Sequence, residues 1–186
     1  MRSHARDKQP RPNRGGAWEG GLARHAPGER RVAAFIGTFE NKIDRKGRVS
    51  VPAPFRQVLA GQAFQGIVAL CSLEVDAIEA CSRDFVDRVM EGIGRRNLPS
   101  KDQNALSVAI FGGSRQLPFD NEGRVVLTDK LLAHAKITDR AAFVGMGNYF
   151  QIWSPDDLDA YMEEARALAK SEAMSLPGLN SLGSGL

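Results

Sequence analysis

The chain has 186 residues, of which 42% are hydrophobic and 25% charged, a composition that supports a folded core and excludes a wholly disordered protein. No apolar run approaches the roughly 20 residues that cross a bilayer, and the basic N-terminus lacks the apolar stretch of a secretory signal. Residues 1–32 hold eight basic and three acidic groups, which leaves 17 basic and 19 acidic groups elsewhere. Nucleic-acid contact by the folded part therefore requires a local basic patch.

The first segment, residues 1–32, is rich in Arg, Gly and Pro and has almost no apolar periodicity, so we expect a disordered basic arm. Such an arm is more often a solvated tail than a specific reader of DNA, and nonspecific attraction to DNA is the alternative. The two cysteines, Cys71 and Cys81, form no C-x-x-C pair, which predicts free thiols and a cytoplasmic location.

An internal repeat organises the rest of the chain. The octapeptide DRKGRVSV at residues 44–51 recurs 76 positions later as DNEGRVVL at residues 120–127. Each copy places Asp-x-x-Gly-Arg after a predicted strand, residues 35–43 or 114–119, and before a short apolar run. The aspartate can accept hydrogen bonds from the loop backbone, and the glycine tolerates a positive φ. Asp44 with Gly47, and Asp120 with Gly123, therefore predict two tight hairpin turns.

The segments after the two turns follow the same order. A short helix comes first, over residues 53–60 after Pro52 and over 129–135 after the N-cap Thr128. Two strands follow, at 67–70 and 77–81 or at 142–145 and 149–153, and a helix capped by Ser82 or Ser154 closes each copy. A linking helix begins at Ser100, which with Gln103 resembles a capping box, and two glycines at 112 and 113 end it.

This order predicts an α+β fold with mostly hairpin-paired strands. After the basic arm, we expect a first repeat over residues 33–97 and a linking helix over 98–113. A second repeat is expected over 114–169 and a flexible tail over 170–186.

The repeat resembles a known family. FIGTFE at residues 35–40, with IDRKGRVSVP at 43–52, is similar to the opening repeat of the MraZ family, and QIWSP at 151–155 is similar to the end of its second repeat. The resemblance covers about residues 35–169. It implies two tandem swapped-hairpin β-barrel repeats of the AbrB/SpoVT-like type, which form an intramolecular pseudo-dimer with short helices. It also implies a ring-shaped homo-oligomer and association with the nucleoid. The function that it implies is transcription regulation through double-stranded DNA, at G-rich repeats upstream of the division and cell-wall gene cluster.

The candidate DNA-binding residues cluster around the first turn. Arg45, Lys46, Arg48 and Arg56 lie within twelve residues, and Arg124 is the counterpart of Arg48 in the second copy. A guanidinium can bond guanine O6 and N7 together, while other cations contact phosphates. The alternative is that Arg48 only pairs with Asp44 across the turn, and both can hold. The second copy has Asn121 and Glu122 in place of Arg45 and Lys46, and Leu132 in place of Arg56, so it is the weaker candidate.

No pattern for catalysis is present in the sequence. The three histidines are scattered, no Cys/His cluster has metal-ligand spacing, and Gly145-Met146-Gly147 lacks the third glycine of a dinucleotide site. We therefore expect no enzyme, cofactor or metal site. Phe150 and Trp153 are expected in the core rather than stacked on bases. A ring-forming scaffold or antitoxin-like partner-binding protein without a DNA operator is the second hypothesis.

Overall fold

The computed structural model describes residues 34–96 and 99–173. The basic arm expected over residues 1–32 and the part of the tail beyond residue 173 lie outside the described residues.

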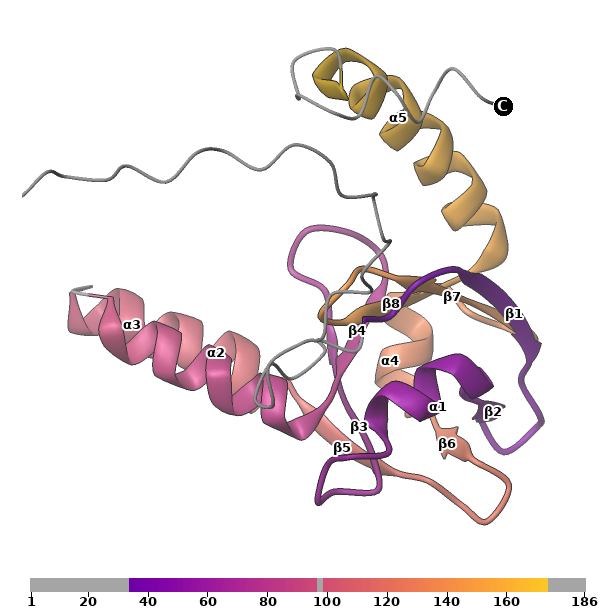
Figure 1. The fold of residues 1–186 in the computed structure, drawn as a ribbon, viewed down its shortest axis with the longest axis horizontal. Helices are drawn as coiled ribbons and strands as arrows, with labels where there is room; N and C mark the ends of the chain where they lie inside the picture. The colour runs from indigo at the N-terminus through magenta and orange to yellow at the C-terminus, as the bar shows by residue number, and fades with distance from the viewer. Residues whose placement is uncertain (1–33, 97–98, 174–186) are drawn as a thin grey trace, which may run out of the picture. The chain divides into compact units, whose positions relative to one another are not determined.

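The described elements follow the order expected for two copies of one unit (Figure 1). The first copy contains β1 (Thr38–Lys42), β2 (Arg48–Ser50), α1 (Ala53–Leu59), β3 (Gly66–Cys71), β4 (Ile78–Cys81) and α2 (Arg83–Arg95). The linking segment contains α3 (Ser100–Ser107) and the π-helix η1 (Val108–Gly112). The second copy contains β5 (Arg115–Pro118), β6 (Arg124–Val126), α4 (Asp129–His134), β7 (Arg140–Gly145), β8 (Phe150–Trp153) and α5 (Pro155–Ala173). The α+β class is thereby confirmed.

The helix starts show where local sequence signals act. The hydroxyls of Ser82, Thr128 and Ser154 accept hydrogen bonds from the backbone N–H three residues further on, at 3.1, 3.5 and 3.2 Å. Helix α3 differs, because its N-cap is Pro99 and no side chain caps it. The capping box expected between Ser100 and Gln103 is therefore wrong. The Pro99 carbonyl accepts from Asp102 and Gln103 instead.

The two copies exchange strands. The six-stranded sheet has the order β1-β7-β8-β4-β3-β5, and its neighbouring strands are antiparallel. The hairpins β3–β4 and β7–β8 are local, and β4 pairs with β8 at the centre. The outer strand β1 pairs with β7 of the other copy, and β5 pairs with β3. A separate two-stranded sheet joins β2 to β6.

The strands beside each Asp-x-x-Gly turn therefore do not form the expected hairpins. Between β1 and β2 there is a single bridge, from Ile43 to Val49, and the two strands then join different sheets. The physical reason is that each turn redirects the chain toward apolar partners supplied by the other copy. The strands β1 and β5 are the edges of the six-stranded sheet, so the described part of the chain contains an open sheet, and a closed barrel is not confirmed.

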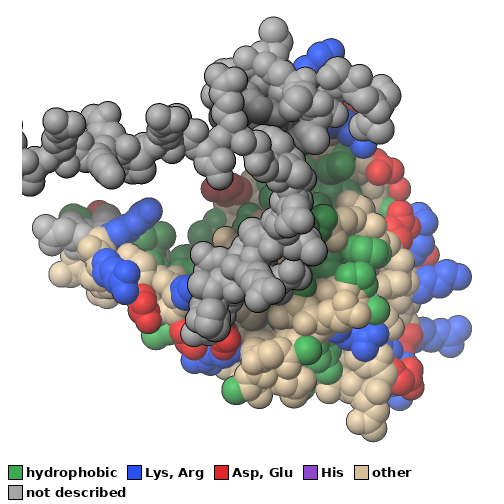
Figure 2. All heavy atoms as spheres, viewed as in Figure 1, with side chains coloured by type: hydrophobic (Ala, Val, Ile, Leu, Met, Phe, Trp, Pro, Cys, Tyr) green, Lys and Arg blue, Asp and Glu red, His purple; other side chains and the backbone are tan. Residues whose placement is uncertain are grey.

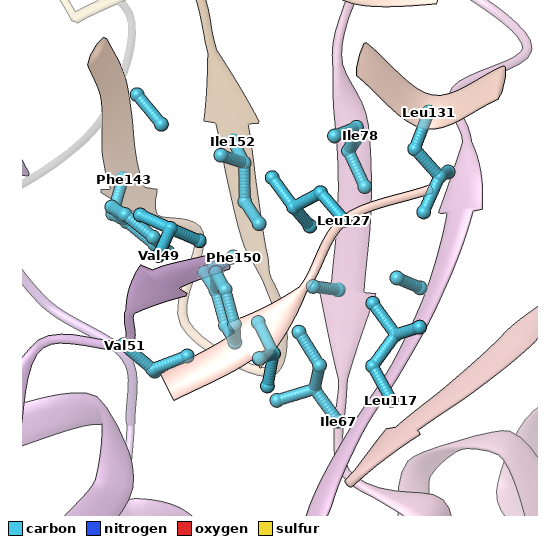
Figure 3. Packing of buried hydrophobic residues seen from close by; sticks show 14 of the residues in the cluster. Val49, Val51, Ile67, Ile78, Leu117, Leu127, Leu131, Phe143, Phe150 and Ile152 are labelled. Atoms are coloured by element: carbon cyan, nitrogen blue, oxygen red, sulfur yellow. The ribbon is translucent and has the colours of Figure 1, made fainter. Parts of the chain in front are cut away.

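The larger of two apolar clusters in the described residues draws side chains from both copies. Val49 and Val125 face each other across β2 and β6, and both are fully buried. Figure 3 shows Val49 of the first copy beside Phe143 and Phe150 of the second. Phe55 of α1 lies at the centre of an aromatic group, with ring centroids 5.0–5.3 Å from Phe35, Phe39 and Phe150. Phe150 and Trp153 are buried, as expected from the sequence.

Candidate nucleic-acid interface

The Asp44 carboxylate organises the first turn, between β1 and β2. Its Oδ1 accepts hydrogen bonds from the backbone N–H groups of Lys46 (2.8 Å) and Arg48 (3.0 Å). Its Oδ2 accepts one from Arg48 Nε (2.6 Å), and Arg48 Nη2 lies 2.6 Å from the same oxygen, which makes an ion pair. These contacts lower the pKa of Asp44 to about 2, and the side-chain hydrogen bond from Arg48 is the largest cause.

The Asp120 carboxylate organises the second turn, between β5 and β6, in the same way. Oδ1 accepts from the backbone N–H groups of Glu122 and Arg124, both at 2.9 Å, and Oδ2 accepts from Arg124 Nε at 2.8 Å. The pKa of Asp120 is lowered, mainly by the backbone hydrogen bond from Arg124. One contact has no counterpart in the first turn: Arg124 Nη1 lies 2.8 Å from Glu122 Oε2. Two carboxylates therefore hold the Arg124 guanidinium.

Glycine is required in both turns by backbone conformation and by space. Gly47 and Gly123 have φ values of +73° and +72°, which L side chains rarely adopt. A Cβ at Gly47 would lie 2.8 Å from the carbonyl oxygen of Leu127. A Cβ at Gly123 would lie 2.8 Å from Cδ and Cζ of Arg56, so the Arg56 side chain occupies the space above this glycine.

The two turns lie at opposite ends of the short ribbon that β2 and β6 form, because these strands pair antiparallel and each turn precedes its own strand. Ser50 is opposite Arg124 in this pairing. Beyond the strand ends, Val51 N–H donates to the Gly123 carbonyl (3.1 Å) and Leu127 N–H donates to the Gly47 carbonyl (2.9 Å). The pKa of Arg124 is raised, mainly by its side-chain hydrogen bond to Asp120. The negative charge of Asp44 in the first turn adds to this rise. We call residues 44–48 and 120–124 together the paired turns.

The paired turns carry unequal charge. Arg45 and Lys46 of the first turn are exposed, and neither forms an ion pair with another described residue. Arg48 is paired but keeps a side-chain exposure of 35%, against 24% for Arg124. In Figure 2, Lys and Arg side chains gather over β1 and the turn that follows it, with Asp and Glu among them. The first turn therefore presents cations to solvent, and the second neutralises its own.

The sequence-based candidates thus lie in or beside the paired turns. Arg45, Lys46 and Arg48 are in the first turn, Arg124 is in the second, and Arg56 of α1 is exposed beside Gly123 with Nε donating to the Val51 carbonyl (3.1 Å). The two hypotheses for Arg48 are compatible, because Asp44 contacts Nε and Nη2 of the guanidinium, which has five N–H donors, and the side chain stays 35% exposed.

Two features of the surface escaped sequence reasoning. Arg56 of the first copy contacts Gly123 of the second. The signal for this contact in the sequence is a difference between the repeats, because Leu132 stands where the first repeat has Arg56. The ion pair between Glu122 and Arg124 had a clearer signal, since an acid two residues before an arginine can reach it across a turn.

Two other kinds of feature are absent from the described residues: metal-type side-chain clusters and membrane-spanning helices. Within residues 34–96 and 99–173, no group of three or more His, Cys, Asp or Glu side chains has the arrangement of a metal site. None of the described helices is both long and apolar enough to cross a membrane. Burial raises the pKa of the Cys81 thiol to about 12, so this group is a protonated, unreactive part of the core.

Comparisons with known proteins point to one family. The family model described as "MraZ protein, putative antitoxin-like" matches residues 34–73 and 110–176. The chain is 41% identical over 147 residues to "Transcriptional regulator MraZ" of Rickettsia bellii (strain OSU 85-389), a match that covers 78% of this chain and 98% of the relative.

Two further proteins of that name are similar over the same extent. The Pelagibacter ubique (strain HTCC1062) protein is 40% identical over 142 residues, 76% of this chain and 92% of the relative. The Rickettsia felis (strain ATCC VR-1525 / URRWXCal2) protein is 37% identical over 146 residues, 78% of this chain and 98% of the relative. With its doubled Asp-x-x-Gly-Arg turn and these matches, the chain belongs to the MraZ family.

Proposed function

We propose that the protein is a sequence-specific DNA-binding regulator of transcription and that the paired turns are its DNA-binding surface. The observation that carries the proposal is the pair of exposed cations in the first turn, Arg45 and Lys46, which form no ion pair with another described residue and lie beside an arginine that Asp44 orients. The name of the relatives, transcriptional regulators, supports the same function.

The cations of the first turn have two different roles in DNA binding, base recognition and phosphate contact. A two-stranded ribbon with its turns fits the major groove, where the free edge of the Arg48 guanidinium can bond guanine O6 and N7. Arg45 and Lys46 contact phosphates and set the register, which adds affinity but no sequence information. Asp44 limits the rotation of Arg48, so less conformational entropy is lost when the guanidinium meets a base.

The fold is proposed to be the swapped-hairpin type of the AbrB/SpoVT group, as an intramolecular pseudo-dimer. The exchange of β1 and β5 between the copies supports this, as does the pairing of β2 with β6. Each copy then takes the part of one subunit.

A ring-shaped homo-oligomer is the proposed assembly. Its support is the apolar surface of the region from α2 to η1, where Met90 and Val108 are 50% and 71% exposed and no residue of either helix is buried. Several copies on repeated short DNA sites would gain affinity by linkage. We place the protein in the cytoplasm, on the nucleoid, at G-rich repeats upstream of the division and cell-wall gene cluster.

A mobility-shift assay tests the function. The full chain is titrated on duplex DNA taken from upstream of its own coding sequence, with a shuffled duplex of the same length as control. We expect tighter binding to the first duplex and a steep loss of affinity as salt rises. Equal binding to both duplexes would contradict sequence specificity, and capture of a protein partner without any DNA binding would favour the scaffold function.

A further inference from the structure

We infer that Arg56 of the first copy, whose side chain lies against Gly123, supplies the cation through which the second turn binds DNA. Arg124 of the second turn does not have this role. The inference deepens the proposed function and rests on it. It predicts one asymmetric DNA-binding interface that contains residues of both copies. The sequence alone suggests two separate turns, of which the second is the weaker candidate for DNA binding.

The first step is the position of Arg56. Its Nε donates to the Val51 carbonyl, and Val51 N–H donates to the Gly123 carbonyl, so the side chain is tied to the point where the two copies meet. Gly123 is buried, and a Cβ there would fall within 2.8 Å of Arg56 Cδ and Cζ. Because glycine has no side chain, the Arg56 guanidinium can pack directly against the backbone of Gly123.

The second step is the charge of the groups around it. Arg124 is held by Asp120 and Glu122, so its charge is cancelled within the turn. Arg56 is exposed and has no ionic partner among the described residues. A phosphate that approaches the second turn meets the Glu122 carboxylate, which is 67% exposed, and the exposed Arg56 is the cation that lies directly against this turn.

The third step is the comparison built into the repeat. The residue equivalent to Arg56 in the second copy is Leu132, whose Cδ1 would lie 3.9 Å from a Cβ at Gly47. The two copies thus place an arginine on one turn glycine and a leucine on the other. The first turn has exposed cations of its own, whereas the second turn depends on Arg56 of the first copy for an exposed cation.

Three variants test the inference. Arg56→Leu places at this position the residue that the other copy already accommodates, so the fold should be retained. Arg56→Lys keeps the charge and loses the planar fork. Glu122→Lys reverses an exposed charge and introduces the residue that stands at position 46. The control is Arg166→Gln, which removes one exposed cation from α5, outside both the paired turns and the region from α2 to η1.

The measurement is fluorescence anisotropy of each full-length variant on the upstream duplex and on the shuffled duplex, over a series of salt concentrations. Arg56→Leu should weaken binding roughly tenfold on both duplexes, as expected for a lost charge-assisted contact. It should also reduce the slope of log K against log salt by about 0.9. Arg56→Lys should restore the slope. Glu122→Lys should tighten binding and steepen the slope, and Arg166→Gln should match the parent.

Unchanged affinity and slope for Arg56→Leu would overturn the inference, and so would an affinity of Glu122→Lys no tighter than that of the parent, because either result places the second turn away from DNA. A weaker Arg56→Leu whose slope equals that of the parent would also overturn it, since Arg56 would then only support the turn. If the parent protein binds neither duplex, the proposed function itself fails. Parent binding with an unaffected Arg56→Leu variant removes only the inference.

Discussion

The substitution Arg48→Ala separates the DNA-binding role of this arginine from its role in the turn. The turn should survive, because Asp44 Oδ1 still accepts the backbone N–H groups of residues 46 and 48 and Gly47 N–H still donates to the Asp44 carbonyl. Only the ion pair through Oδ2 is lost, and solvent screens it because both side chains are more than a third exposed. The melting temperature should therefore stay close to that of the parent.

The loss of base recognition should be much larger than the loss of stability. A bidentate arginine–guanine contact contributes about 1–3 kcal/mol of discrimination, which corresponds to roughly 5- to 150-fold. The loss multiplies when several subunits contact one DNA. We expect Arg48→Ala to lower the affinity for the upstream duplex toward that for the shuffled duplex, while the salt dependence changes by one contact at most.

DNA affinity and protein stability are measured on the same preparation of each variant. Anisotropy gives the affinity ratio of the two duplexes, and differential scanning fluorimetry and light scattering report fold and assembly. Lys46→Ala is the matched control, since it removes an exposed cation of the same turn and should weaken both duplexes alike. An Arg48→Ala protein with the parent's affinity ratio would refute the assignment of Arg48 as the base-reading residue, and a collapsed fold would refute the reasoning about the turn.

Three further outcomes are expected. Arg124→Ala should reduce DNA affinity less than Arg48→Ala, because Glu122 already offsets this charge; equal losses in anisotropy would contradict it. Phe55→Ala should destabilise the protein by about 3–5 kcal/mol through loss of its buried ring contacts, lowering Tm by roughly 10–20 °C, whereas the exposed Gln57→Ala should have little effect. The stabilising effect of Asp44, whose folded pKa is depressed from 3.8 to about 2, should be complete above pH 3.8 and lost as pH falls through about 2. The Tm difference between the parent and Asp44→Asn should shrink over that range, and a constant difference would argue against it.

Local signals in the sequence predicted the elements and the turns well, and the physical reason is that these signals are short-range. The hydroxyl caps at Ser82, Thr128 and Ser154 and the Asp-x-x-Gly turns depend on residues within four positions of each other. The order of strands and helices followed from them.

Strand partners were beyond local reasoning. The alternation of apolar residues says which face of β1 is buried, but Phe39 lies opposite Phe143, a partner that no local pattern identifies. The residues alone suggested a hairpin across each turn, and only the family resemblance implied an exchange between copies. The contact of Arg56 with Gly123 depends on that exchange, so the sequence could nominate Arg56 as a cation but could not say which turn it serves.

The strand exchange also constrains how the protein is made. Thr38 is paired with Val144, and Val49 with Val125, so β1 and β2 leave the ribosome long before their partners exist. At the usual 5–20 residues per second, a separation on the order of 100 residues leaves these strands without partners for roughly 5–20 seconds. The nascent first copy therefore lacks these strand partners until the second copy has been made, and the sheet order described above cannot form within a chain that ends before the second copy.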